Sequence, residues 1–69
     1  MIEEARLISF NAATRRAVIQ LTQSPEAYLE EVAAALDIPA AEMQAGRKLL
    51  VCFPGAHNAK SAVITSVFV

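Results

Sequence analysis

Short apolar runs occur in pairs at the two ends of this chain. Near the amino end, an apolar run over residues 5–10 is followed by a polar-leaning break at residues 11–14 and by a second run over residues 16–21. In the second run Ala17 and Ile19 share one face, because the side chains of a strand alternate with a period of two. Two short runs separated by a turn-length break predict a β-hairpin.

The carboxyl end repeats this pattern with a longer break. Leu49, Val51 and Phe53 share one side of an apolar run, turn-forming residues occupy 54–61, and residues 62–69 form the last run. The last run places three valines on one side: Val63, Val67 and Val69. These features predict a second hairpin. In both hairpins the opposite face is also partly apolar, which an open sheet with one solvated face does not need.

The middle of the chain fits two different elements. A helix over residues 25–36 would begin with Ser24 as N-cap and Pro25 at the first helical position, and several apolar residues follow at helical spacing. The competing interpretation is a strand, because alternate residues of 32–38 are apolar, followed by one helical turn over residues 40–43. Short apolar runs do not decide between the two by periodicity.

A series of short motifs runs from Ser24 to Val69. Its members are Tyr28-Leu29, Ile38-Pro39-Ala40-Ala41-Glu42-Met43, Gly46-Arg47, the run Leu49–Phe53, Asn58 and Ala62-Val63-Ile64. The series resembles a group of short proteins from bacteriophages and bacterial genomes, in which an opening hairpin precedes a strand ending in Ile-Pro, a helical turn and two more strands. It is similar, more loosely, to the small OB-like and SH3-like barrels of phage tails and baseplates.

These observations predict one all-β domain over residues 1–69. We expect a small five-stranded antiparallel barrel of the SH3 or OB-like type with one short helical turn, since closing a sheet on itself hides its edges. Glu30-Glu31 and the alanines at 33–35 depart from the pattern of the similar proteins. An α+β fold of the order β-β-α-β-β, with a helix over residues 25–36, is therefore the alternative.

The apolar content of the chain is high for its size. Of its 69 residues, 55% are apolar, whereas a domain this small buries only about 60% of the surface that its unfolded chain exposes. We expect Val67, Phe68 and Val69 to be ordered and at least partly buried, because chain ends fray unless they are tied into a sheet. The excess apolar surface predicts a protein partner, either in self-association as a homo-oligomer or in attachment to a larger assembly.

Charge is distributed unevenly although the net charge is only −1. Residues 24–45 carry five acidic residues and no Lys or Arg, whereas the rest of the chain carries all six basic residues and only two acids. This predicts a polarised protomer whose acidic segment meets the basic segment of a neighbour. The candidate interface residues are Glu30, Glu31, Arg15, Arg16, Val67, Phe68 and Val69.

Candidate chemistry is sparse. Cys52 lies in an apolar run, where a free cysteine is expected to act as a small hydrophobic residue. A Cys52–His57 nucleophile pair has no third, orienting group near it in the sequence. No recognised metal-ligand spacing or phosphate-binding motif is present in the sequence. We therefore expect no enzyme, with no catalytic, cofactor-binding or metal-binding residues.

The resemblance implies a non-enzymatic structural or assembly module, and most specifically a bacteriophage virion component associated with the capsid or tail. The acidic start of the chain and the short apolar runs predict no secretion signal and no membrane partner. Together with the resemblance, this implies a location in the virion or the host cytoplasm. The alternative is a small-barrel nucleic-acid-binding protein that uses Arg15, Arg16, Arg47 and Lys48. Nucleic acid is the less favoured partner because the chain has few aromatic residues for base stacking.

Overall fold

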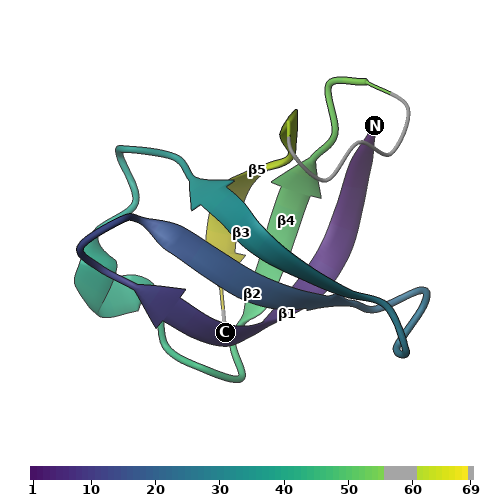
Figure 1. The fold of residues 1–69 in the computed structure, drawn as a ribbon, viewed down its shortest axis with the longest axis horizontal. Coiled ribbons are helices and arrows are strands. Elements are labelled where there is room, and N and C mark those ends of the chain that lie inside the picture. Colours follow the sequence, from purple (N-terminus) through teal and green to yellow (C-terminus); the bar gives the residue numbers. More distant parts are fainter. Residues whose placement is uncertain (56–60, 69) are drawn as a thin grey trace.

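The computed structural model describes residues 1–55 and 61–68 and contains five strands and one short 3-10 helix (Figure 1). The strands are β1 (Ile2–Asn11), β2 (Arg16–Leu21), β3 (Tyr28–Ala34), β4 (Lys48–Cys52) and β5 (Val63–Phe68), and the helical turn η1 (Ala40–Glu42) lies between β3 and β4. The predicted all-β class with one short helical turn is confirmed. The alternative helix over residues 25–36 is wrong, because β3 occupies this segment.

The five strands form one closed, mixed sheet. Their order is β1-β2-β3-β5-β4, and β4 pairs back with β1. Neighbouring strands are antiparallel except for β3 and β5, which are parallel and pair Ala33 with Val63 and Ala34 with Ile64. The prediction of a wholly antiparallel sheet is therefore wrong at this contact. The cause is the path of the chain. β3 runs in the same direction as β1, because both are antiparallel to β2, and β5 also runs in this direction, because both β1 and β5 are antiparallel to β4.

Strand pairing overrides the helix signals before β3. Ser24 and Pro25 lie in a turn and do not start a helix, since Ser24 N donates to Leu21 O and Ala27 N donates to Ser24 O. Local helix propensity is a weak preference that tertiary contacts outweigh. Here the contacts are the pairing of β3 with β2 on one side and with β5 on the other.

The predicted extension of this strand to Ile38 is also wrong. β3 ends at Ala34, and a turn follows in which Ile38 N donates a hydrogen bond to Ala35 O. Leu36 lies in that turn and is 88% exposed, whereas Ile38 is buried. The apolar alternation therefore continues past the point where the backbone leaves the sheet.

The core lies inside the closed sheet and, among the described residues, contains no buried polar or charged residue. Its members come from all five strands, from both sides of η1, and from the positions directly after β4 and directly before β5. The predicted inward faces of β2 and β4 are confirmed, because Ala17, Ile19, Leu49 and Val51 are buried, as is Phe53 directly after β4.

Three bulges interrupt the strand registers. Single extra residues lie in β1 at Ile8 and in β5 at Thr65, and in β3 two residues oppose one residue of β2. A bulge changes which residues face the core, because it shifts the alternation by one position. In β5 Val67 packs against the core, but Ile64 replaces Val63 as the inward residue before the bulge. The predicted grouping of Val63 with Val67 is therefore wrong.

Candidate functional site

The structure divides the predicted interface residues between two regions. Arg16 and Glu31 line the same hollow beside the β1–β2 turn, and the neighbouring Glu30 is exposed on β3. Val67 and Phe68 are the last residues of β5, and the predicted interface residue Val69 lies outside the described residues. Arg16, Glu30 and Glu31 therefore lie on β2 and β3, whereas Val67 and Phe68 lie at the end of β5.

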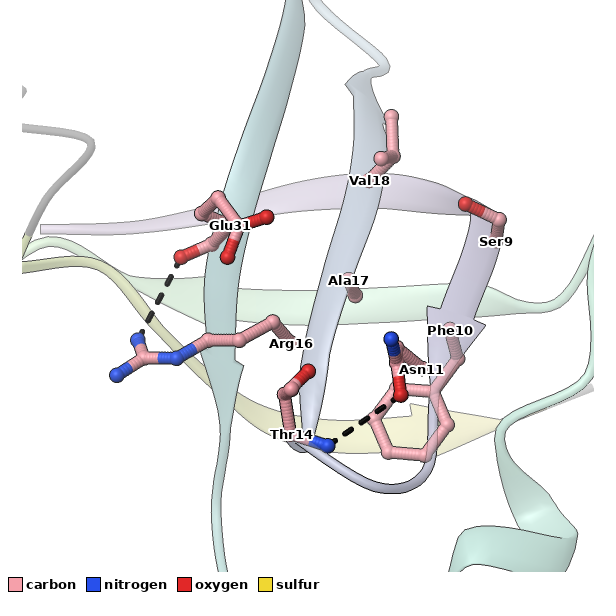
Figure 2. Close-up of a pocket in the computed structure, with 8 residues that line it drawn as sticks. All are labelled: Ser9, Phe10, Asn11, Thr14, Arg16, Ala17, Val18 and Glu31. Atoms are coloured by element: carbon pink, nitrogen blue, oxygen red, sulfur yellow. Dashed lines mark hydrogen bonds between the residues drawn. The ribbon is translucent and has the colours of Figure 1, made fainter.

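The hollow has a volume of about 220 Å³ and opens between β1, β2 and β3 (Figure 2). It is lined by Ser9, Phe10, Asn11, Thr14, Arg16, Ala17, Val18 and Glu31. The bulges of β1 and β3 both border it. A bulge bends its strand and re-aims side chains, so these two irregularities explain why the surface is indented at this place.

Polar groups of the hollow are held by the backbone around them. Asn11 Oδ1 accepts hydrogen bonds from the backbone N–H groups of Ala13, at 2.9 Å, and Thr14, at 3.3 Å, an arrangement that stabilises the β1–β2 turn. Arg16 Nη1 donates a long 3.5 Å hydrogen bond to Glu31 O, and Figure 2 shows its side chain extending toward Glu31. The hollow thus presents two hydroxyls, an amide and both signs of charge beside the Phe10 ring, which suits hydrogen bonding to a polar ligand or to a partner's main chain.

Glu31 has a left-handed backbone with φ of 59°. This conformation is uncommon for a residue with a side chain and costs free energy. It occurs because the bulge of β3 needs a sharp local turn of the backbone. The strained position lies at the rim of the hollow.

Arg15, a predicted interface residue, makes its contacts inside the protein. Its Nη2 atom donates to the carbonyl oxygens of Ala35 and Ile38, both at 2.7 Å. Its guanidinium lies 5.8 Å from the centroid of the Phe10 ring, and its Nε atom is buried without a hydrogen-bond partner. Arg15 therefore joins the β1–β2 turn to the turn after β3 and is not a free surface charge.

Acidic and basic residues that are separate in the sequence meet in space. Glu42 of the acidic segment forms an ion pair with Arg47, with 2.6 Å between Oε1 and Nη1, and Arg16 reaches the backbone of Glu31. The uneven distribution along the sequence therefore does not produce an acidic face and a basic face at these two places. Of the predicted basic interface residues, Arg16 is the exposed one.

A second surface lies on the outer side of β1, β4 and β5. The strand pairs align Ile2, Cys52 and Val63 in one row, and Arg6, Lys48 and Phe68 in another. A middle row contains Glu4, Leu50 and Ser66. We call these nine residues the β4 outer face. The sequence indicates this surface only through the partly apolar second face of the two hairpins. Which residues lie in one row depends on the strand order, which the sequence does not show.

Exposure differs along the β4 outer face. Ile2 is 62% exposed and Phe68 is 40% exposed, whereas the free Cys52 is half-buried in the row beside Ile2. His57, the predicted partner in a nucleophile pair, lies outside the described residues. The described residues contain no group of three or more His, Cys, Asp and Glu side chains that could hold a metal ion.

Comparisons with protein-family models, with curated proteins and with solved structures find no match to this chain. In the described part of the chain, no helix is long and apolar enough to cross a membrane. The function proposed below therefore rests on the geometry of the chain and on the resemblance of its motifs.

Proposed function

We propose that this protein is a non-enzymatic structural module that assembles with other protein chains. The observation that carries the proposal is the large apolar side chains left exposed around an apolar core. In the described part of the chain these are Leu36 at 88%, Ile2 at 62%, Met1 at 60%, Tyr28 at 57%, and Ile8 and Phe68 at 40% each. Exposed apolar side chains that gather on one surface mark contact sites for protein partners. Ile2 and Phe68 share the β4 outer face, so this surface supports an interface.

We infer an OB-like barrel as the architecture of the module. Support comes from the strand order, from the parallel contact of β3 with β5, and from the helical turn between β3 and β4. A path along paired residues can be followed once around the sheet. It starts at Asn11 of β1, passes through Arg16, Ala33, Val63 and Cys52, and returns to β1 at Ile2, nine residues from its start. Such a large stagger corresponds to strongly tilted strands that close on themselves.

The setting that we propose is a bacteriophage virion, with the module associated with the capsid or tail and located in the virion or the host cytoplasm. The resemblance of residues 24–69 to short phage barrel proteins supports this setting. In this setting the protein forms a homo-oligomer or attaches to a larger protein assembly.

A nucleic-acid-binding barrel is the alternative. The observation that favours it is the position of the hollow, since OB-folds bind oligonucleotides on strands 2 and 3 and on the loop between strands 1 and 2. Arg16 lies there. The other predicted cations contribute less. Arg15 is bound to backbone carbonyls, Arg47 is paired with Glu42, and Lys48 lies on β4 and does not line the hollow.

Sedimentation velocity over a wide concentration range tests the proposal, together with nucleic-acid titrations over a salt series. The assembly module is expected to self-associate or to bind a protein partner, and to bind nucleic acid weakly. A chain that stays monomeric, binds no protein and binds nucleic acid with a steep salt dependence would favour the alternative, because contacts with phosphates release counterions.

A further inference from the structure

We infer that copies of this chain associate head to side, with the turn that bears Leu36 in one copy packed on the β4 outer face of the next copy. This inference rests on the proposed function as an assembly module. It names the two surfaces that meet and the kind of symmetry that results.

The first surface is the turn over residues 35–38, which we call the Leu36 turn. Its backbone is fixed from two sides, because Ala35 N donates to Ile64 O at 3.0 Å and Arg15 donates to the carbonyl oxygens of Ala35 and Ile38. The Leu36 side chain is nevertheless 88% exposed. An apolar side chain on a backbone that is already ordered loses little further entropy on binding, which makes it an effective anchor.

The surroundings of Leu36 allow a close approach. Pro39, Ala40 and Ala41 follow the turn and are exposed, and they carry no long side chain that would hold a partner away. Figure 1 shows the β1–β2 turn, the chain after β3 and η1 at the same end of the molecule. Asp37, next to Leu36, is exposed and gives this apolar surface a negative charge.

The second surface, the β4 outer face, has the complementary character. Its apolar side chains include the exposed Ile2 and Phe68, with Leu50 half-buried in the middle row. Its end beside Phe68 carries two positive charges, Arg6 and Lys48, in one row across the strands. Glu4 lies in the middle row, so the cations are confined to the end beside Phe68. An apolar anchor with an adjacent carboxylate therefore meets apolar area and two cations at this end of the face.

The charges also oppose contacts of either surface with its own copy. A two-fold contact between two Leu36 turns brings the two Asp37 carboxylates near one another, because Asp37 is next to Leu36. A two-fold contact between two β4 outer faces, centred on the middle of β4, places Lys48 against Lys48 when the axis runs along the strands and Glu4 against Glu4 when it runs across them. Like charges in direct opposition disfavour a contact, whereas Asp37 opposite Arg6 or Lys48 favours it.

Contact between two different surfaces leaves one surface of each kind free on the growing assembly. Such head-to-tail contacts close into a ring when the rotation between copies allows it and otherwise continue as a filament. The occupant of the β4 outer face is therefore the Leu36 turn of a second copy, and the product is a ring or a filament in place of a two-fold dimer.

Two variants that each damage one surface test the inference by sedimentation velocity from micromolar to millimolar concentration. Leu36→Ser removes the anchor, and Ile2→Glu places an acid on the β4 outer face at an exposed position. Each variant is expected to weaken association by about tenfold or more. Tyr28→Ser is the matched control, because Tyr28 is 57% exposed on β3 and belongs to neither surface, and it should associate like the wild type.

An equimolar mixture of the two variants gives the decisive result. One intact Leu36 turn and one intact β4 outer face remain in the mixture, so it should form a heterodimer that grows no further. The inference is overturned if the mixture stays monomeric, if Leu36→Ser associates like the wild type, or if the wild type is monomeric at millimolar concentration. A monomeric wild type that binds a different protein would overturn only this inference, whereas a chain that binds nucleic acid alone would overturn the proposed function as well.

Discussion

The Nη2 atom of Arg15 lies 2.7 Å from the carbonyl oxygen of Ile38, a residue 23 positions later in the chain. The same atom donates to Ala35 O, so one guanidinium closes both ends of the Leu36 turn. Arg15 can do this because its backbone is left-handed, with φ of 56°, which directs its side chain differently from that of Arg16. Two adjacent and identical residues consequently have different roles.

Replacing Arg15 by Lys should lower the free energy of unfolding by about 1 to 3 kcal/mol. The lysine side chain is one atom shorter, so its ammonium does not reach the position from which Nη2 donates to both carbonyls, and it lacks the planar group beside the Phe10 ring. Urea denaturation measures the change. Arg16→Lys is the matched control and should change the free energy of unfolding by less than about 0.5 kcal/mol, since Arg16 is exposed. Equal effects of the two substitutions would contradict the assigned role of Arg15.

Replacing Cys52 by Ala should cost at most about 1 to 2 kcal/mol of unfolding free energy, because the side chain is a half-buried member of the outer face. Leu49→Ala is the comparison, since Leu49 is fully buried in the core, and it should cost about 2 to 5 kcal/mol. Thermal or urea unfolding of both variants checks the order. A Cys52→Ala variant less stable than Leu49→Ala would show that the outer face is part of the core.

Glycine should be tolerated better at position 31 than at position 30. Glu31 has a φ of 59°, where glycine removes steric strain of about 1 to 2 kcal/mol, whereas glycine at position 30 only adds conformational entropy to the unfolded chain. Glu31→Gly is therefore expected to be more stable than Glu30→Gly by about 1 to 2 kcal/mol. Urea midpoints with equal m values would establish this difference, and the reverse order would exclude strain at the β3 bulge.

Removing residues 67–69 should destabilise the protein by about 1 to 3 kcal/mol. Val67 pairs with Leu49 and packs against the core, and burying a valine side chain contributes about this much when burial is complete. A chain that ends at Phe68 is the control, because it retains the packing of Val67. Identical melting of the shorter chain and this control would mean that the end of β5 adds nothing to stability.

The two hairpins and the inward faces of β2 and β4 could be predicted because alternation is a local property of each strand, whereas the bulge at Thr65 shifts the alternation in β5. Leu49, Val51 and Phe53 alternate in the sequence and line the core in the structure. The conformation of β3 could not be decided in the same way, since its helix signals are local whereas its pairs with β2 and β5 are distant. The parallel β3–β5 contact follows from the path of the whole chain.

The candidate site was predicted less well than the fold. Sequence separation suggested that acidic and basic residues occupy different faces, but Glu42 and Arg47 are five positions apart and form an ion pair. Bulges were also invisible, because an extra residue such as Thr65 is defined only by the strand opposite. The β4 outer face joins strands from both ends of the chain, so no local pattern could show it.

The closure of the sheet also bears on how the protein is made. β5 is the last of the five strands to leave the ribosome, yet it joins β3 to β4. Until it arrives, β3 and β4 each present a row of unpaired backbone N–H and C=O groups, which can pair with other chains. The nascent chain is therefore most prone to misassociation just before synthesis of the last strand, and a messenger truncated before the codon for Val63 would yield a product that aggregates instead of folding.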